Sequence, residues 1–537
     1  MMVSVMRARS ARREAARRAI PLMLAGALAA PLAATAQGPR AVPEAALTVR
    51  SFAVRGDNPL GAAATAAVLA PFVGERVDID RLEAAAQALE AAIRARGFAF
   101  HRVSVPPQTP ADGVVALAVV RFVLGEVGIT GNRHFDAANV RASLPALVPG
   151  AAVQAQAVAR QIAIANENPS KRTSLTMRAG ARADTVDAEI KVEDSDPQQV
   201  YVALNNTGRR ETGMLRATAV YQHNNLFGRD HGLTASFTTS PDHLDDVRQY
   251  GVNYVVPLYA LGGSVAAFYT RSDVNSGRIA DFFDVRGRGE FAGLRYTHTL
   301  FKVGAYAHKL TAGIESHHFR NDVTTSLAPG QPLGTDVGSR PLSLRYQGSW
   351  DVTAGSAGFF VEYLRNLDGG SGNAQAAYSA NRAGASRSWE SWRFGVDASR
   401  VLSRDWMLAA RLRGQAAPRE LIPGEQFGLG GVASVRGFRE RETAGDSGYA
   451  LSLELWAPSV AGGVRPFVFV DAGARRLRNP PPGQAGFDAL SSVGVGMRWQ
   501  WQKRLEVSLD LAGVVNGAAG GTTRGSSRLH FGVVYRF

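Results

Sequence analysis

The sequence predicts a membrane all-β barrel of about 16 antiparallel strands, preceded by two small periplasmic α+β units. Residues 198–537 consist of segments of about ten residues in which apolar and polar positions alternate, as barrel strands do, with Gly, Asn, Asp or Ser between them. The final segment ends on an aromatic residue, Phe537. The N-terminus carries the pattern of a secretory signal, which would deliver the chain beyond the cytoplasm.

Residues 1–36 form the predicted signal peptide. Arginines between positions 7 and 18 make a basic region, and an apolar stretch follows from Ala19 to Ala34. Ala34-Thr35-Ala36 then supplies the small residues that a cleavage site needs. Cleavage there leaves residues 37–46 as a short N-terminal extension before the first strand.

The composition excludes several classes of protein. The chain has no cysteine, so it holds neither a disulfide nor a thiolate metal site. Its formal net charge is +14, but beyond the signal peptide the positive residues are spread thinly. A secreted chain without a Lys/Arg-rich run is not expected to bind nucleic acid.

The sequence carries no enzyme signature. It contains no P-loop, no G-x-S-x-G and no H-E-x-x-H pattern. His317 and His318 are neighbours, and neighbouring residues of a strand point to opposite faces, so they do not predict a metal site. We therefore expect no catalytic residues, no cofactor and no metal.

Two copies of a small α+β unit are predicted, over residues 47–122 and 123–194. In the first copy, Asp80 and Glu83 resemble a capping box at the start of a helix, and Gly97 ends it. The helix carries an apolar stripe made of Leu82, Ala86, Leu89 and Ile93. Strands are expected at 47–54, 98–105 and 114–122, then in the second copy at 123–130, 173–178 and 185–193, with helical stretches at 136–142 and 153–166.

The alternating segments of residues 198–537 fit either a soluble sandwich or a membrane barrel. In one segment Tyr250, Val252 and Tyr254 share an apolar face. The opposite faces carry many charges, which a sandwich core could not bury unpaired but a wet lumen could hold. About 340 residues at roughly 20 per strand and turn suggest about sixteen strands. Charged residues expected to keep the lumen wet are Glu454, Asp510 and Arg536.

The last segment is similar to the C-terminal signal by which outer-membrane barrels are assembled. Its apolar face consists of Leu529 followed by Phe531, Val533, Tyr535 and Phe537. The expected partners of such a strand are the barrel-assembly machinery and outer-membrane lipid.

A long loop at residues 417–447 is the most informative part of the chain, because a loop of this length in a compact domain is usually functional. It contains Val435-Arg436-Gly437-Phe438 among several glycines. A later strand contains Phe469, Asp471 and Gly473, which lie on one face by alternation.

These two motifs resemble those of the barrel-assembly and two-partner-secretion transporter superfamily. Val435-Arg436-Gly437-Phe438 is similar to the V-R-G-[FY] tip of its inward-folded loop, and Phe469, Asp471 and Gly473 match its F-x-D-x-G strand motif. The two α+β units resemble its POTRA domains. Two units point to the two-partner-secretion branch, the transporters of haemolysins and filamentous haemagglutinins.

The resemblance implies an outer-membrane protein of a Gram-negative bacterium with periplasmic POTRA domains. Arg436 would fold into the lumen and pair with Asp471. An unfolded exoprotein client with an N-terminal secretion domain would bind the second unit, pass through the porin-like channel and fold outside into a β-helix, with activation as a further possible outcome. The expected client-binding residues are Val153, Ile162, Thr173 and Leu175.

Relatives commonly carry an N-terminal helix that plugs the pore. Residues 37–46 would span only about 15 Å as a helix, against a bilayer core of about 30 Å, so a plug helix is not expected here. An insertase of other outer-membrane proteins shares the loop motif and is the main alternative function, although insertases typically carry more periplasmic units. A solute porin would have no reason to combine the two motifs.

Overall fold

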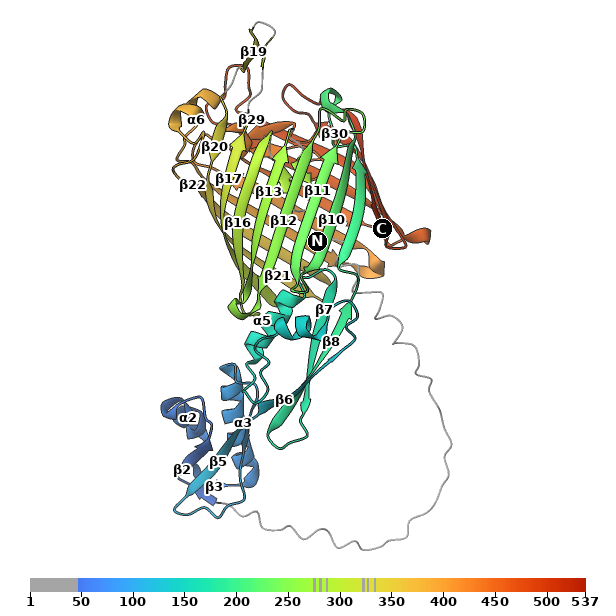
Figure 1. Cartoon of the computed structure of the whole chain (residues 1–537). Coiled ribbons are helices and arrows are strands. Elements are labelled where there is room, and N and C mark those ends of the chain that lie inside the picture. Colours follow the sequence, from blue (N-terminus) through green and yellow to red (C-terminus); the bar gives the residue numbers. More distant parts are fainter. Residues whose placement is uncertain are drawn as a thin grey trace, which may run out of the picture.

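The computed structural model describes residues 47–273, 277–279, 283–285, 288–320, 324–325, 328–332 and 335–537. Two small α+β units lie below a large β-barrel (Figure 1). We call the barrel end beside these units proximal and the opposite end distal. The predicted signal peptide and the extension at 37–46 lie outside the described residues. Among the helices of the described ranges, none is both long and apolar enough to cross a membrane.

The first unit is a three-stranded sheet covered by helices. In it β2 runs parallel to β5, and β4 is antiparallel to β5. The predicted stripe of α3 is buried against the sheet residue Leu117. The elements are β1 Leu47–Val49, β2 Ser51–Gly56, α2 Ala62–Leu69, η2 Ala70–Phe72, β3 Gly74–Val77, α3 Ile79–Ala95, β4 His101–Ser104 and β5 Val114–Arg121.

Two local predictions in this unit were wrong. Asp78, not Asp80, caps α3: its side chain accepts a hydrogen bond from the backbone N–H of Arg81 at 2.8 Å. The helix α2 was not predicted at all. Five of its eight residues are alanine and Thr65 is its one polar residue, so it has no polar face whose spacing could reveal a helix.

The second unit repeats the sheet order, as the sequence predicts. Its strand β6 is parallel to β8, and β7 is an antiparallel edge strand. The elements are β6 Val123–Thr130, α4 Ala137–Ala142, α5 Ala155–Ala165, β7 Lys171–Ala179 and β8 Thr185–Asp194.

The predicted barrel is confirmed: residues from Gln198 onward close into an antiparallel sheet. β20 and β21 both pair with β17 and share one position, so the described strands fill sixteen positions. The barrel closes where β31 pairs with β9. Its strands are β9 Gln198–Asn205, β10 Arg216–Leu226, β11 His231–Thr239, β12 Gln249–Leu258, β13 Gly263–Ser272, β16 Gly289–Thr299, β17 Tyr306–Phe319, β20 Val337–Ser339, β21 Pro341–Val352, β22 Gly355–Asn366, β23 Glu390–Val401, β24 Met407–Ala416, β27 Ser447–Trp456, β28 Val464–Arg476, β29 Phe487–Trp501, β30 Leu505–Asn516 and β31 Ser527–Arg536.

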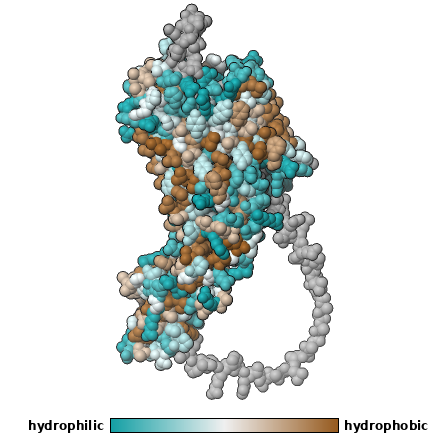
Figure 2. Space-filling view, in the orientation of Figure 1, coloured by the Kyte–Doolittle hydropathy of each residue, from teal (hydrophilic) through white to brown (hydrophobic). Residues whose placement is uncertain are grey.

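The two faces of the barrel wall differ as the alternation predicts. Tyr250, Val252 and Val396 are exposed on the outside, where hydrophobic residues gather over the strands (Figure 2). Asp471 and Asp510 point inward and are buried. Smaller elements join the strands: η3 Arg210–Thr212, η4 Tyr259–Leu261, β14 Gly277–Ile279, β15 Phe283–Val285, β18 Thr324–Thr325, β19 Ala328–Pro332, α6 Gln375–Asn381, η5 Ser403–Asp405, η6 Pro423–Glu425, β25 Phe427–Leu429, β26 Thr443–Gly445 and η7 Ala461–Gly463.

Candidate functional site

The long loop between β24 and β27 folds into the barrel. It narrows to a hairpin in which β25 pairs antiparallel with β26. Beyond the hairpin lies its tip, the segment Val435-Arg436-Gly437-Phe438, which contacts the inner faces of β27, β28, β30 and β31. The tip is therefore held by the barrel wall itself.

At the tip, Arg436 forms a forked ion pair with Asp471, near the middle of β28. Its Nε and Nη2 donate to the two carboxylate oxygens at 2.7 and 2.8 Å, and its backbone N–H donates to the same carboxylate at 3.0 Å. The side chains are 4% and 0% exposed, so water does not compete for these bonds. Such a bidentate pair sets orientation as well as affinity.

The remaining surface of the guanidinium is also occupied. Nη1 lies 2.9 Å from a carboxylate oxygen of Glu454, and Nη2 donates to Ser452 Oγ at 2.9 Å. The guanidinium carbon stacks 3.5 Å from the ring centroid of Phe469. One guanidinium thus contacts two carboxylates and the face of an aromatic ring. Lysine could not make all these contacts, because its ammonium group is neither planar nor forked.

Apolar contacts seat the tip on either side of the arginine. Val435 and Phe438 are completely buried, and they pack with Leu429 of the hairpin against the barrel wall. The wall residues of this cluster are Ala450, Leu490 and Val514.

Two glycines allow the close approach. Gly437 has a φ of +95°, and a Cβ there would lie 3.2 Å from Val514 and 3.3 Å from Ala512. A Cβ on Gly473 would lie 2.5 Å from Leu429 Cδ1 and 2.6 Å from the backbone oxygen of Tyr449. The glycines of both motifs are therefore where loop and wall meet without room for a side chain.

The base of the loop is held separately, at the distal end. Glu425 is fully buried and lies 2.7 Å from His317 Nδ1, with Ser339 donating to it at 2.7 Å. Asp446, also fully buried, forms an ion pair with Arg382 just after α6. His317, which the sequence placed beside His318 without a role, is thus part of the loop's anchor.

The second α+β unit is fastened to the proximal turns of the barrel. Lys171 Nζ lies 2.5 Å from Asp230 in the turn after β10, with side chains 0% and 2% exposed. The same ammonium donates to Asn139 at 3.0 Å, and Tyr259 donates to Asp230 at 2.6 Å. Burial lowers the pKa of Lys171 and the carboxylate of Asp230 opposes that shift.

Further contacts widen this junction. Lys309 in β17 lies 2.5 Å from Glu167, and Arg160 of α5 stacks 4.5 Å from the ring centroid of Phe301. Asn168 donates to the backbone oxygen of Asn224 at 2.7 Å. The barrel residues in these contacts are distant in sequence from the second unit, so no local sequence pattern predicts the contacts.

The residues predicted to bind a client do not face solvent. Val153 and Thr173 are 7% and 2% exposed, and Ile162 and Leu175 pack into the core of the second unit. Only the family resemblance placed a docking surface on these residues. Their side chains are mostly packed within the unit, between α5 and its own sheet, so client binding there stays a prediction.

The backbone edge of β7 remains available. Thr173 directs its N–H and C=O away from β8 and toward the side chain of Asn166, at 2.6 and 2.9 Å. Since these groups alternate along a strand, Leu175 and Met177 direct theirs to the same outer side.

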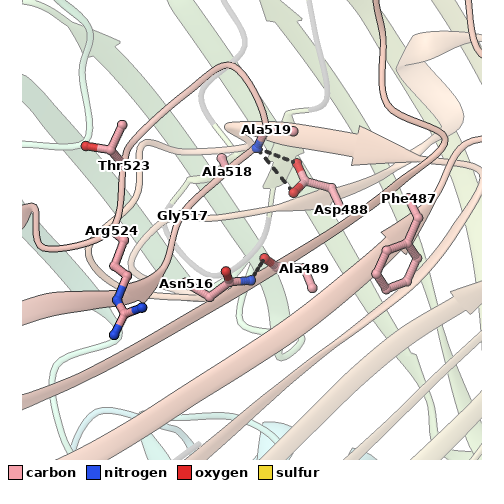
Figure 3. Close-up of a pocket in the computed structure, with 9 residues that line it drawn as sticks. All are labelled: Phe487, Asp488, Ala489, Asn516, Gly517, Ala518, Ala519, Thr523 and Arg524. Atoms are coloured by element: carbon pink, nitrogen blue, oxygen red, sulfur yellow. Dashed lines mark hydrogen bonds between the residues drawn. The ribbon is translucent and has the colours of Figure 1, made fainter.

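The C-terminal residues Phe531, Val533, Tyr535 and Phe537 lie on or just beyond β31, with Tyr535 and Phe537 in an edge contact of 4.9 Å. A hollow at the distal rim lies between the start of β29 and the loop after β30 (Figure 3). There Asp488 accepts from the N–H of Ala519, and Asn516 donates to the backbone of Ala489. These bonds fasten the loop before β31 to the wall.

Fold and site together define a transmembrane β-barrel with two preceding α+β units and a loop seated in its lumen. The family described as haemolysin secretion/activation protein ShlB/FhaC/HecB matches residues 185–499, and the ShlB-type POTRA domain matches residues 47–121. The chain belongs to this haemolysin secretion/activation family, as the sequence motifs predict.

Named relatives agree with this assignment. The outer membrane transporter CdiB of Escherichia coli is 22% identical over 459 residues, covering 82% of this chain and 74% of that protein. The heme/hemopexin transporter protein HuxB of Haemophilus influenzae (strain 86-028NP) is 21% identical over 400 residues, covering 72% and 68%. The solved structure of CdiB from Escherichia coli superposes with a TM-score of 0.74 at 19% identity, covering 95% and 93%.

These findings confirm the predicted class and place. The chain is a two-partner-secretion transporter of the outer membrane, with periplasmic POTRA domains. The proximal end of the barrel is therefore periplasmic and the distal end extracellular.

Proposed function

We propose that this transporter secretes a large exoprotein, which it captures unfolded at the second POTRA domain and passes through the barrel lumen. Its relatives include a transporter named for heme/hemopexin, but the chemistry of this chain does not single out a client. The observation that carries the proposal is the loop tip held in the lumen by Arg436 and Asp471, directly above a domain with an open strand edge.

The edge of β7 supports capture by strand addition. An unfolded chain can pair with outward N–H and C=O groups whatever its side chains, so backbone bonds supply the affinity. Leu175 and Met177 offer those groups, and Asn166 occupies the outer side of the strand at Thr173. A client strand would therefore register from Leu175 toward Ala179.

The seated tip supports a route through the lumen. Phe438, Arg436 and Leu429 are held on the wall by side-chain contacts and not by a continuous sheet, so the tip can leave as a unit. Charged wall residues, such as Glu506 and its partner Arg536 at 2.8 Å, keep the path hydrated.

We also propose that the barrel-assembly machinery inserts this barrel, reading the strand that ends at Phe537, and that outer-membrane lipid surrounds it. Alternating apolar residues on the outer face of β31, ending on an aromatic, support this. Replacing Phe537 by Ser should reduce the amount of heat-modifiable barrel in the outer membrane. An unchanged amount would contradict the proposed signal.

The deciding experiment compares the proteomes of medium and outer membrane with and without this gene. Loss of one large protein from the medium, with the membrane proteome unchanged, would identify the client. Depletion of many barrel proteins would instead show an insertase.

The capture step has its own matched pair of variants. Met177→Pro removes an outward N–H from β7, whereas Met177→Ala shortens the same side chain and keeps that N–H. Secretion should fall in the proline variant alone. Equal secretion by both variants, at equal barrel levels, would exclude capture at this edge.

A further inference from the structure

The loop tip also has a polar contact with a fourth wall residue, which neither motif contains. The backbone N–H of Gly437 donates to His530 Nε2 at 2.9 Å. His530 lies on the inner face of β31, the last strand, and is 5% exposed. The residue next to Arg436 is thus held by the strand that closes the barrel.

This contact requires one protonation state. A nitrogen that accepts from a backbone N–H must carry a lone pair, so the imidazole is neutral, with its proton on Nδ1. Protonation would place a second hydrogen between the two nitrogens. The bond would then become a repulsive contact between two donors, at a buried position where water does not separate them.

The charged groups around His530 come from several elements. Arg436 lies on the loop, Asp471 on β28 and Arg528 on β31 itself. Asp510 of β30 is the register neighbour of His530 and forms an ion pair with Arg498 of β29 at 2.6 Å. From β9, Asn206 contributes only neutral groups, bonding to the backbone of Leu529 and Phe531. Each carboxylate near His530 therefore already has an arginine partner, and no carboxylate is left to receive an imidazolium.

We propose that His530 is a positioning residue that seats the loop tip through an acid-labile hydrogen bond, so that its protonation frees the tip from β31 and lets the lumen open more often. The ion pair between Arg436 and Asp471 outlasts this step, which makes the released tip tethered on one side. Because β31 also pairs with β9 over only five register positions, from Gly532 to Arg536, the bond couples the tip to the barrel's closing seam.

The proposal rests on the proposed route through the lumen, which the seated tip would occlude until it leaves, but it requires no client. The experiment is the conductance of the purified full-length protein in planar bilayers, from about pH 7.5 to about pH 3, a range that spans the protonation of a buried imidazole. The wild type should open on acidification, with open probability rising about tenfold for the loss of one such bond.

Two variants separate the histidine from other titrating groups. His530→Gln retains an acceptor oxygen without a titrating proton, so it should stay closed across the whole range. His530→Lys carries a permanent donor and should be open at neutral pH. His318→Gln, on the outward face of β17 with its side chain 36% exposed, serves as the matched control and should keep the acid response of the wild type.

Acid opening that persists in His530→Gln, or a wild type that does not respond to acid, would overturn the proposal. Arg436→Ala distinguishes the two levels of failure. If that variant opens while acid does not open the wild type, the tip occludes the lumen and His530 is no switch. If the lumen opens neither in Arg436→Ala nor in the acidified wild type, the tip does not occlude the lumen.

Discussion

Two buried ion pairs in this protein resemble each other chemically, but one joins a whole domain to the barrel and the other joins only a loop tip to it. Lys171 and Asp230 join the second POTRA domain to a barrel turn, with side chains 0% and 2% exposed. Arg436 and Asp471 join a loop tip to the barrel wall, at 4% and 0%. Both pairs cross between elements, and both are shielded from water.

The surroundings of the two pairs differ. Asp230 also receives Tyr259 and Asn139, and the salt bridge of Lys309 with Glu167 adds a second attachment between the same two bodies. The tip has the contacts of Arg436 with Asp471, Glu454 and Ser452, one histidine bond and an apolar seat, and its own share of them lies within four consecutive residues. A junction with dispersed contacts resists separation, whereas a compact one can be released by a local event.

The largest expected effect comes from Arg436→Ala. Removing one partner of a buried pair costs about 3–5 kcal/mol, and somewhat less where water can enter. We expect the tip to leave its seat, conductance in planar bilayers to rise and secretion of the client to fall. Arg413→Ala is the control, since Arg413 pairs with Asp397 on the neighbouring strand at 2.7 Å and the pair is partly exposed. Tight closure of Arg436→Ala would exclude the tip as the occluding element.

The junction should respond nearly as strongly to Lys171→Met. Asp230 would remain buried without its cation, at a cost of about 2–4 kcal/mol after allowing for its bonds to Tyr259 and Asn139. Spin labels on the domain and the barrel should show a broadened distance distribution. In the exposed pair of Lys191 with Glu193, side chains 63% and 71% exposed, Lys191→Met should leave the distribution unchanged. A narrow distribution in Lys171→Met would mean that the other contacts suffice.

Gly473→Ala sharpens the comparison on the tip side. The added methyl would lie 2.6 Å from the backbone oxygen of Tyr449 in β27 and 2.5 Å from Leu429 Cδ1 in the hairpin. Because β27 is fixed in the barrel wall, the hairpin should lift by a few tenths of an ångström. We expect destabilisation of the seat by about 1–3 kcal/mol, seen as intermittent channel opening. Gly513→Ala is the matched control. A Cβ at this position would lie 3.9 Å from the nearest atom, the backbone oxygen of Val493, so the variant should behave as wild type. Identical recordings from both variants would contradict the close-packing argument.

The smallest expected effect concerns Asp194, at the end of β8. Its burial raises the pKa, but the backbone N–H groups of Arg133, His134 and Phe135 donate to the carboxylate at 2.9–3.0 Å and the net shift is downward. The stabilisation is therefore present above the carboxyl's ordinary pKa and is lost as pH falls through the lowered one.

Asp194→Asn should speed amide exchange at residues 133–135 about two- to tenfold near neutral pH, the range for one modest hydrogen bond. The difference from wild type should vanish in acid. A difference that persists at low pH would show that the side chain acts through packing and not through its charge.

Much of the fold was predictable because it depends on short-range periodicity. Alternation at period two marks strands such as the one holding Tyr250 and Val252, and a wet lumen leaves that alternation visible. The helix α2 was hidden because its alanines show no contrast between faces. In the second POTRA domain, the family resemblance pointed to Ile162 and Leu175 as client-binding residues, whereas the structure packs both side chains against the domain's own core.

The sequence by itself determined the class of this protein. Its alternating periodicity predicted the barrel, and the motifs that contain Arg436 and Asp471 indicated the family by their resemblance. Only the tertiary structure decided which groups meet. Lys171 contacts Asp230, which is 59 residues away in sequence, and Gly437 contacts His530, which is 93 residues away. Such contacts depend on strand register and barrel closure, which the whole chain sets together. They leave no local pattern, because a single buried lysine or histidine looks the same in a sequence whatever it faces.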